Sequence, residues 1–114
     1  LQLMEKRLSR RGMTIVTAPD GQSALDIVTE AMKQPETMFQ VVVMDVRMPG
    51  MDGLETLRHM KKIAPKLPVL LLTGHASLGV AVQGMDLGAY DYMLKPVAIN
   101  ELIIKMEEAV RAAA

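Results

Sequence analysis

Apolar residues recur along the chain in two alternating patterns. Residues 41–44 and 69–72 are apolar at every position, which is typical of strands buried on both faces of a parallel sheet. Two further strands are predicted, one from the short β-branched stretch at residues 13–18 and one over residues 90–95. Helical spacing of apolar residues predicts helices over about residues 1–11, 22–33, 52–64, 77–87 and 99–110. This order, a helix followed by four strand–helix units, predicts an α/β fold with a doubly wound parallel sheet and helices on both faces.

Glycines and polar residues mark the predicted helix ends. Gly12 and Gly88 follow helical patterns and are expected to end them. Asp52, three residues before Glu55, resembles a capping box at the start of a helix. Gly74, Gly79 and Gly84 are expected to weaken the fourth helix, by roughly 1 kcal/mol for each interior glycine. Either this helix moves during function, or it is a surface helix that tolerates them.

Eleven methionines against one phenylalanine and no tryptophan make the apolar composition unusual. Methionine is a flexible filler of cores and also serves in adaptable binding grooves. Four of these residues fall on buried phases of the predicted elements, which favours the core interpretation: Met4, Met32, Met44 and Met106.

Composition and charge exclude several classes of protein. With 114 residues, half of them hydrophobic, the chain can bury the core of one domain and is not a disordered segment. The 13 basic and 13 acidic side chains balance, which argues against a nucleic-acid surface. Cysteine is absent, which excludes disulfides and thiolate sites and suits a reducing cytoplasm. No apolar run approaches the ~20 residues of a membrane span, and no GxxxxGK loop offers a nucleotide site.

Three chemically distinct residues end the predicted buried strands: Asp45, Thr73 and Lys95. In parallel sheets, ligands bind beyond the carboxyl ends of the strands, so these side chains are expected to converge. A carboxylate, a hydroxyl and an ammonium together suit a phosphoryl group, which the carboxylate could accept as an acyl phosphate. Each residue alone has an ordinary structural explanation as a turn, cap or solvated residue. Their occurrence at the same end of three strands favours a functional site.

Three sequence blocks resemble the signatures of the receiver domains of two-component response regulators. They are VVVMDVRMPGMDGLE at 41–55, LLLTGHAS at 70–77 and GAYDYMLKP at 88–96. Their order and spacing match the family over nearly the whole chain. The resemblance implies a flavodoxin-like receiver fold with five parallel strands, four of them within this sequence. It also implies a signalling switch that is controlled by phosphorylation.

The resemblance implies a role for each matched site residue. Asp45 would take a phosphoryl group from a sensor histidine kinase or phosphotransfer protein and would bind Mg²⁺, with the backbone carbonyl of Arg47 as a further metal ligand. Thr73 would hydrogen-bond the phosphoryl group, and Lys95 would pair with it. Tyr92 matches the switch aromatic, which would move inward as Thr73 moves toward the phosphoryl group. The fourth helix, fifth strand and fifth helix would form the face that contacts an output domain or a second copy in a homodimer.

Other matched positions are expected to shape or tune the pocket. Met48, Pro49 and Gly53 match the loop that shapes the acidic pocket, and the bond between Lys95 and Pro96 would be cis. A second set would flank the phosphoryl group and tune its hydrolysis: Arg47, Gly74 and His75. For Arg47 and His75, simple solvation without a role is an equally consistent interpretation.

The sequence departs from the family pattern at its start. Receivers open with a hydrophobic strand that ends in an acidic pair, and these acids complete the Mg²⁺ site. Neither precedes the first predicted helix. We therefore expect residues 1–114 to be one receiver domain that is incomplete at its N-terminus. Roughly one strand, or ~5–10 residues, and the acidic pair would lie upstream of Leu1.

The leading hypothesis is a phosphoacceptor domain, with no enzymatic activity beyond self-catalysed phosphotransfer and autodephosphorylation. It would contact neither nucleic acid nor membrane itself. A receiver-like interaction module that is never phosphorylated is the alternative, favoured if the upstream residues lack two acids. A phosphatase-like enzyme with Asp45 as nucleophile would need a second Asp as acid/base, commonly two residues on, where Arg47 stands.

Overall fold

The structure is a computed structural model that describes residues 2–47 and 52–113. This part of the chain forms five α-helices and three strands, with two short 3₁₀ turns, η1 and η2. In chain order they are α1 (Gln2–Arg10), α2 (Gly21–Ala31), η1 (Pro35–Thr37), β1 (Val42–Asp45), α3 (Gly53–Ile63), β2 (Val69–Thr73), η2 (His75–Ser77), α4 (Leu78–Asp86), β3 (Asp91–Leu94) and α5 (Ile99–Ala113).

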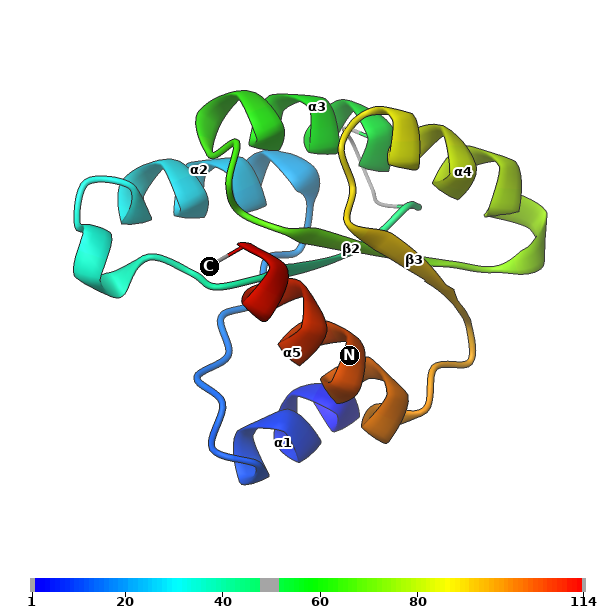
Figure 1. The fold of residues 1–114 in the computed structure, drawn as a ribbon, viewed down its shortest axis with the longest axis horizontal. Helices are drawn as coiled ribbons and strands as arrows, with labels where there is room; N and C mark the ends of the chain where they lie inside the picture. The colour runs from blue at the N-terminus through cyan, green and yellow to red at the C-terminus, as the bar shows by residue number, and fades with distance from the viewer. Residues whose placement is uncertain (1, 48–51, 114) are drawn as a thin grey trace.

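The three strands form a parallel sheet in the order β1-β2-β3. Helices α2, α3 and α4 lie on one face of the sheet, and α1 and α5 lie on the other (Figure 1). Strand β2 is buried along its whole length because it is central in this sheet and covered on both faces. The predicted α/β fold with a parallel sheet and helices on both faces is confirmed.

Residues 13–18 are not a strand, and the prediction of four strands within this chain was wrong. This segment runs irregularly from α1 to α2 (Figure 1), and Val16 is 54% exposed. A strand forms only where a neighbour accepts and donates its backbone hydrogen bonds. Within residues 2–47 and 52–113 no strand pairs with this segment or with the free edge of β1. Local β propensity alone therefore leaves the segment without regular structure.

The last strand is shorter than the predicted range 90–95, but its hydrogen bonds extend to both ends of that range. The Tyr90 amide donates to the Val69 carbonyl, and the Lys95 amide donates to the Thr73 carbonyl, each at 2.8 Å. Lys95 is therefore fixed in register with the end of β2, which places its side chain at the carboxyl edge of the sheet.

The helix-end signals predicted at Asp52 and Gly12 are confirmed, and the structure adds a cap at Asp20. Asp52 caps α3, and its carboxylate accepts a hydrogen bond from the Glu55 amide at 2.8 Å. Asp20 caps α2 in the same way through the Ser23 amide, also at 2.8 Å. This hydrogen bond is the main cause that lowers the pKa of Asp20. Gly12, just beyond α1, has a φ of 86°, a left-handed conformation that favours glycine at a helix end.

Alternate residues of β2 supply two separate cores. Val69 and Leu71 pack with Leu57 and Met60 of α3, in the cluster beneath α2, α3 and α4. Leu70 and Leu72 pack with α5 in a second cluster on the opposite face. The side chains of β2 project to opposite faces with a period of two, so one strand anchors both helical layers.

The methionine prediction is confirmed in part. Met44 and Met106 are 4% and 8% exposed and belong to the two cores. Met32 is 43% exposed, because α2 ends at Ala31 and Met32 lies beyond the buried stripe of the helix. Met4 belongs to α1, but its side chain lies outside the described part of the structure.

The glycines predicted to weaken the fourth helix differ in their surroundings. Gly74 precedes η2 and is not part of α4. A Cβ at Gly84 would lie 2.4 Å from Cδ1 of Leu71, so a larger residue there would have to displace the end of that buried side chain. A Cβ at Gly79 would meet nothing within 4 Å, so this glycine lowers helix stability without a packing reason.

A polar network joins β3 to α5. The Tyr90 hydroxyl donates to Oε2 of Glu108 at 2.9 Å, and Lys105 Nζ lies 2.9 Å from Oδ2 of Asp91 and 3.3 Å from Oε2 of Glu108. The hydrogen bond from Tyr90 is the main cause that lowers the pKa of Glu108, and the same bond raises the pKa of Tyr90. The hydrogen bond to Asp91 raises the pKa of Lys105.

These shifts predict that the network stabilises the fold at neutral pH and is lost at both extremes. Glu108 contributes above its ordinary pKa of 4.5 and loses this contribution as pH falls through its lowered value. Tyr90 contributes below its ordinary pKa of 10.0 and loses this contribution as pH rises through its raised value. In a Tyr92→Phe background, ultraviolet titration of Tyr90 should give a midpoint above 10.0. Glu108→Gln should lower this midpoint.

The exposed neighbour Glu107 provides the matched control for this titration. Glu107→Gln removes the same charge from α5 and should leave the Tyr90 midpoint where it was. Equal midpoints in the Glu108→Gln and Glu107→Gln proteins would show that the hydrogen bond does not govern the Tyr90 titration.

No described helix combines the length and the hydropathy that a membrane span requires.

Candidate functional site

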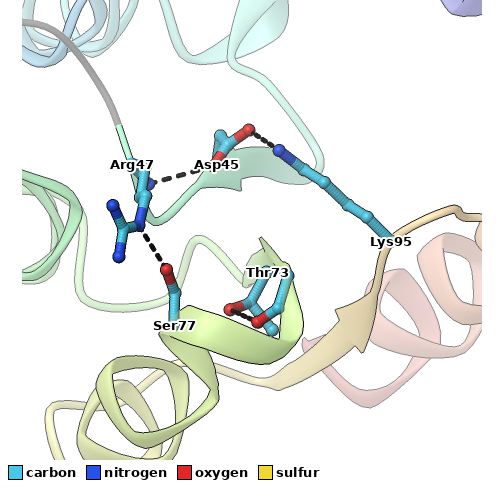
Figure 2. Close-up of polar contacts among 6 residues, drawn as sticks. Asp45, Arg47, Thr73, Ser77 and Lys95 are labelled. Carbon is cyan, nitrogen blue, oxygen red and sulfur yellow. Dashed lines mark hydrogen bonds and ion pairs between the residues drawn. The ribbon is translucent and has the colours of Figure 1, made fainter.

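The three predicted strand-end residues lie at one edge of the sheet. Asp45 ends β1, Thr73 ends β2, and Lys95 follows β3 directly. Parallel pairing aligns these ends, since Asp45 is in register with Leu72 and Thr73 with Leu94. Figure 2 shows the three side chains around the end of the sheet. The predicted convergence is therefore correct, although the three groups do not all touch.

Asp45 and Lys95 form an ion pair between Oδ2 and Nζ (Figure 2). The other carboxylate oxygen, Oδ1, accepts a hydrogen bond from the Arg47 amide at 2.9 Å. The side chains of Asp45 and Lys95 are 31% and 45% exposed, so the pair is open to reagents from solvent. The carboxylate is thus oriented by two donors and still accessible.

Thr73 lies beside this pair but faces its own loop. Its side chain is fully buried, and its hydroxyl donates to the Gly74 carbonyl at 3.0 Å. This partner is local, so a rotation of the side chain would release the hydroxyl for a new acceptor at the sheet edge.

A contact between Arg47 and Ser77 was not anticipated from the sequence. Nε of Arg47 donates to Oγ of Ser77, which links the end of β1 to the turn before α4 (Figure 2). Ser77 is only 3% exposed. The two residues are 30 positions apart in the sequence. The sequence predicts for Ser77 only that a helix begins there. Its one sequence signal was a helix-capping residue type at that position.

The other predicted residues, Tyr92 and His75, each lie in a different environment. Tyr92 is half-buried and packs against the cluster that contains Leu71 and Ala81. His75 is exposed on η2, directly after Gly74. The predicted cis bond between Lys95 and Pro96 is present.

The loop that follows β1 is described only in part. Gly53 packs closely against the backbone of Val46: a Cβ there would lie 2.7 Å from Cα and from the carbonyl oxygen of Val46. Met48 and Pro49, the other predicted loop residues, lie outside the described residues.

Comparison with known proteins decides the family. The family described as the response regulator receiver domain matches residues 1–107. This chain belongs to that family. A receiver domain of a response regulator is a phosphorylation-dependent signalling switch of two-component systems, and this is the function of the domain. Nothing in the comparisons supports the alternative of a module that is never phosphorylated.

Individual relatives give the same result. Over 108 residues, 95% of this chain, the receiver domain is 38% identical to the DNA-binding transcriptional regulator NtrC of Escherichia coli (strain K12). It is 39% identical over 108 residues to the response regulator MprA of Mycolicibacterium vanbaalenii. These matches span only 22% of NtrC and 44% of MprA, so the receiver domain corresponds to less than half of either relative.

Solved receiver structures share the fold. A response regulator receiver domain protein from Clostridium thermocellum superposes with a TM-score of 0.87 at 33% identity, covering 98% of this chain and 86% of that one. The receiver domain of NtrX from Brucella abortus superposes with a TM-score of 0.83, also at 33% identity, covering 96% and 88%. The predicted receiver fold is confirmed.

Proposed function

We propose that Asp45 is the phosphoacceptor of this receiver domain. The observation that carries the proposal is the accessible carboxylate, held between the Lys95 ammonium and the Arg47 amide. A carboxylate oxygen of Asp45 attacks the phosphorus of a phosphohistidine on a sensor kinase or phosphotransfer protein. The new P–O bond forms as the P–N bond breaks, and the electron pair returns to the imidazole. The product is an acyl phosphate on Asp45.

Lys95 and Thr73 receive the charge that the phosphoryl group brings. Lys95 already contacts the attacking carboxylate, so its ammonium neutralises charge as the group arrives. The Thr73 hydroxyl exchanges the Gly74 carbonyl for a phosphoryl oxygen, a stronger charged acceptor. Its movement opens space on the side of β2 where Tyr92 packs, and Tyr92 follows inward.

We also propose that this site binds Mg²⁺, for which the described residues supply part of the ligand set. Within residues 2–47 and 52–113, no three His, Cys, Asp or Glu side chains gather into a group that could hold a metal ion. Asp45 and the main-chain carbonyl of Arg47 offer the oxygen donors that Mg²⁺ prefers. The acidic pair of the family pattern has no match in residues 1–114. Bound Mg²⁺ would neutralise phosphoryl charge.

The output of the switch is proposed to pass through α4, β3 and α5. Apolar side chains are exposed on all three elements, with Val82 and Met85 on α4, Leu94 on β3 and Ile104 on α5 at 49%, 36%, 39% and 62%. Such side chains suit contact with an output domain or a second copy of the chain. We also propose that the domain works in the cytoplasm, because a sequence without cysteine suits a reducing compartment. Its chemistry is limited to phosphotransfer to itself and autodephosphorylation.

The proposal is tested by phosphorylating the full-length protein with acetyl phosphate and Mg²⁺. Intact-mass analysis should show the addition of one phosphoryl group, and Asp45→Asn should abolish it. Asp26→Asn, on the exposed face of α2, is the matched control and should be phosphorylated normally. Phosphorylation that persists in the Asp45→Asn protein would place the acceptor elsewhere.

A further inference from the structure

Ser77 stands at the position from which a side chain would cap α4, but its hydroxyl is engaged elsewhere. It is the residue before Leu78, the first residue of α4, and its side chain makes no hydrogen bond to the amides of that helix. Instead, Oγ accepts the hydrogen bond from Nε of Arg47 (Figure 2). Serine is among the most favourable capping residues, so this helix start lacks a stabilisation that its own sequence provides for.

The capped helices show what Ser77 would have to change. Asp20 and Asp52 have extended ψ angles of 173° and 166°, and each accepts a hydrogen bond from an amide at the start of its helix. Ser77 has a ψ of 11°, as expected for the end of the 3₁₀ turn η2. To cap α4, its backbone must turn to the extended conformation, which unwinds η2. That turn begins two residues after Thr73, so the same loop carries both groups.

Phosphorylation of Asp45 would offer the Arg47 guanidinium a stronger hydrogen-bond acceptor than Ser77. Its amide is fixed to the Asp45 carboxylate, so the base of its side chain lies next to the phosphoacceptor. The guanidinium of this exposed side chain contacts a neutral hydroxyl in the structure. A phosphoryl group at Asp45 would offer charged oxygens, and hydrogen bonds between charged groups are roughly twice as strong as neutral ones.

We propose that Ser77 is a positioning residue with two alternative partners. Before phosphorylation it binds Arg47 and keeps the guanidinium away from Asp45. After phosphorylation Arg47 moves to the phosphoryl group, and the freed Ser77 hydroxyl caps the first turn of α4. The exchange rests on Asp45 as the phosphoacceptor, and it gives α4 a direct response to the phosphoryl group that does not pass through Thr73 or Tyr92.

The exchange has opposing contributions. Unwinding η2 gives up the hydrogen bonds from the Ser77 amide to the Gly74 carbonyl and from the Leu78 amide to the His75 carbonyl, and the new contacts of Arg47 and Ser77 offset this loss. Ser77 gives up one hydrogen bond and gains another, while Arg47 gains a charged acceptor. Helix α4 is susceptible to such a change, because the open surroundings of Gly79 leave its first turn with low intrinsic stability. Ala81 and Gly84, later in the helix, are buried. The effect is therefore expected at the start of α4.

Nuclear magnetic resonance on the full-length protein tests both states, the one in which Ser77 binds Arg47 and the one in which it caps α4. Without phosphoryl analogue, the Arg47 Nε–H signal should be shifted and protected from solvent exchange. Ser77→Ala should remove that protection, and Ser77→Thr, which keeps a hydroxyl, should restore it. Ser9→Ala, the same substitution on exposed α1, should leave the signal unchanged.

The second state is tested by adding beryllofluoride, an analogue of the acyl phosphate, with Mg²⁺. The amides of Gly79 and Val80, in the first turn of α4, should exchange with solvent about fivefold more slowly, the gain expected of a helix cap. The gain should be absent in Ser77→Ala and present in Ser77→Thr.

The outcomes separate this inference from the proposed phosphorylation site. If beryllofluoride causes no spectral change that depends on Asp45, the phosphoacceptor proposal fails. If it binds at Asp45 and the Gly79 and Val80 amides gain equal protection in the wild-type and Ser77→Ala proteins, the partner exchange is overturned alone. An Arg47 signal that is the same in the wild-type and Ser77→Ala proteins also overturns it.

Discussion

Replacing Lys95 with alanine is expected to slow phosphorylation of Asp45 by acetyl phosphate about 100-fold, the effect typical of losing one group that stabilises transition-state charge. Lys95 Nζ contacts Oδ2 of Asp45, and it is the cation that pairs with this carboxylate in the described part of the chain. The phosphoryl group carries negative charge and approaches a carboxylate that is itself negatively charged. Without the ammonium, that charge is met mainly by the Arg47 amide on the other oxygen. The rate is measured by intact-mass analysis over time.

Folding and chemistry should respond differently to this change. The two side chains are 45% and 31% exposed, and an ion pair screened by solvent contributes about 1 kcal/mol or less to stability. Urea unfolding of the Lys95→Ala protein should therefore remain close to that of wild type. Lys66→Ala removes an equal charge from an exposed loop position and should change neither measurement. A Lys95→Ala protein that is phosphorylated at the wild-type rate would exclude Lys95 from the reaction.

The core of this site could be predicted because the positions of Asp45 and Lys95 follow from local rules. For Asp45, a continuous apolar run identifies a buried parallel strand, and the residue that ends such a strand must lie at the carboxyl edge of the sheet. For Lys95, the preceding segment contains Asp91 and is only partly buried, and the position of Lys95 follows from strand composition and the proline after it. Each run is short, so the end of each strand is set within a residue. The ion pair between Asp45 and Lys95 is a direct result of this alignment.

Features that depend on distant partners could not be predicted in the same way. The β-branched stretch at 13–18 has the composition of a strand, but strand formation depends on a neighbour and not on composition. The Arg47–Ser77 hydrogen bond joins residues 30 positions apart. It depends on the rotamer of Arg47, which the pattern of apolar residues does not predict. The hydrogen bond from the Thr73 hydroxyl to the adjacent Gly74 carbonyl could not be predicted either, because a hydroxyl rotates to whichever acceptor is nearest in the folded structure.

Gly53→Ala is expected to lower the free energy of unfolding by about 3 kcal/mol, which is a large part of the stability of a small domain. A Cβ at Gly53 would lie 2.7 Å from both Cα and the carbonyl oxygen of Val46. These are backbone atoms directly after Asp45, so no side-chain rotation can relieve the overlap. The first residue of α3 must then move away from the end of β1, and the hydrogen bond from the Gly53 amide to the Val46 carbonyl, 3.2 Å long, is weakened.

Gly79→Ala is the matched control for this prediction, because it adds the same methyl group to a helix at a glycine with open surroundings. It should raise the free energy of unfolding by up to about 1 kcal/mol, the difference in helix propensity between alanine and glycine. Urea unfolding of both proteins compares the two effects directly. Opposite signs are expected because the substitutions share their chemistry and differ in what the new methyl group meets. A Gly53→Ala protein as stable as Gly79→Ala would mean that α3 can shift without loss, and that the close contact between Gly53 and the Val46 backbone is not required.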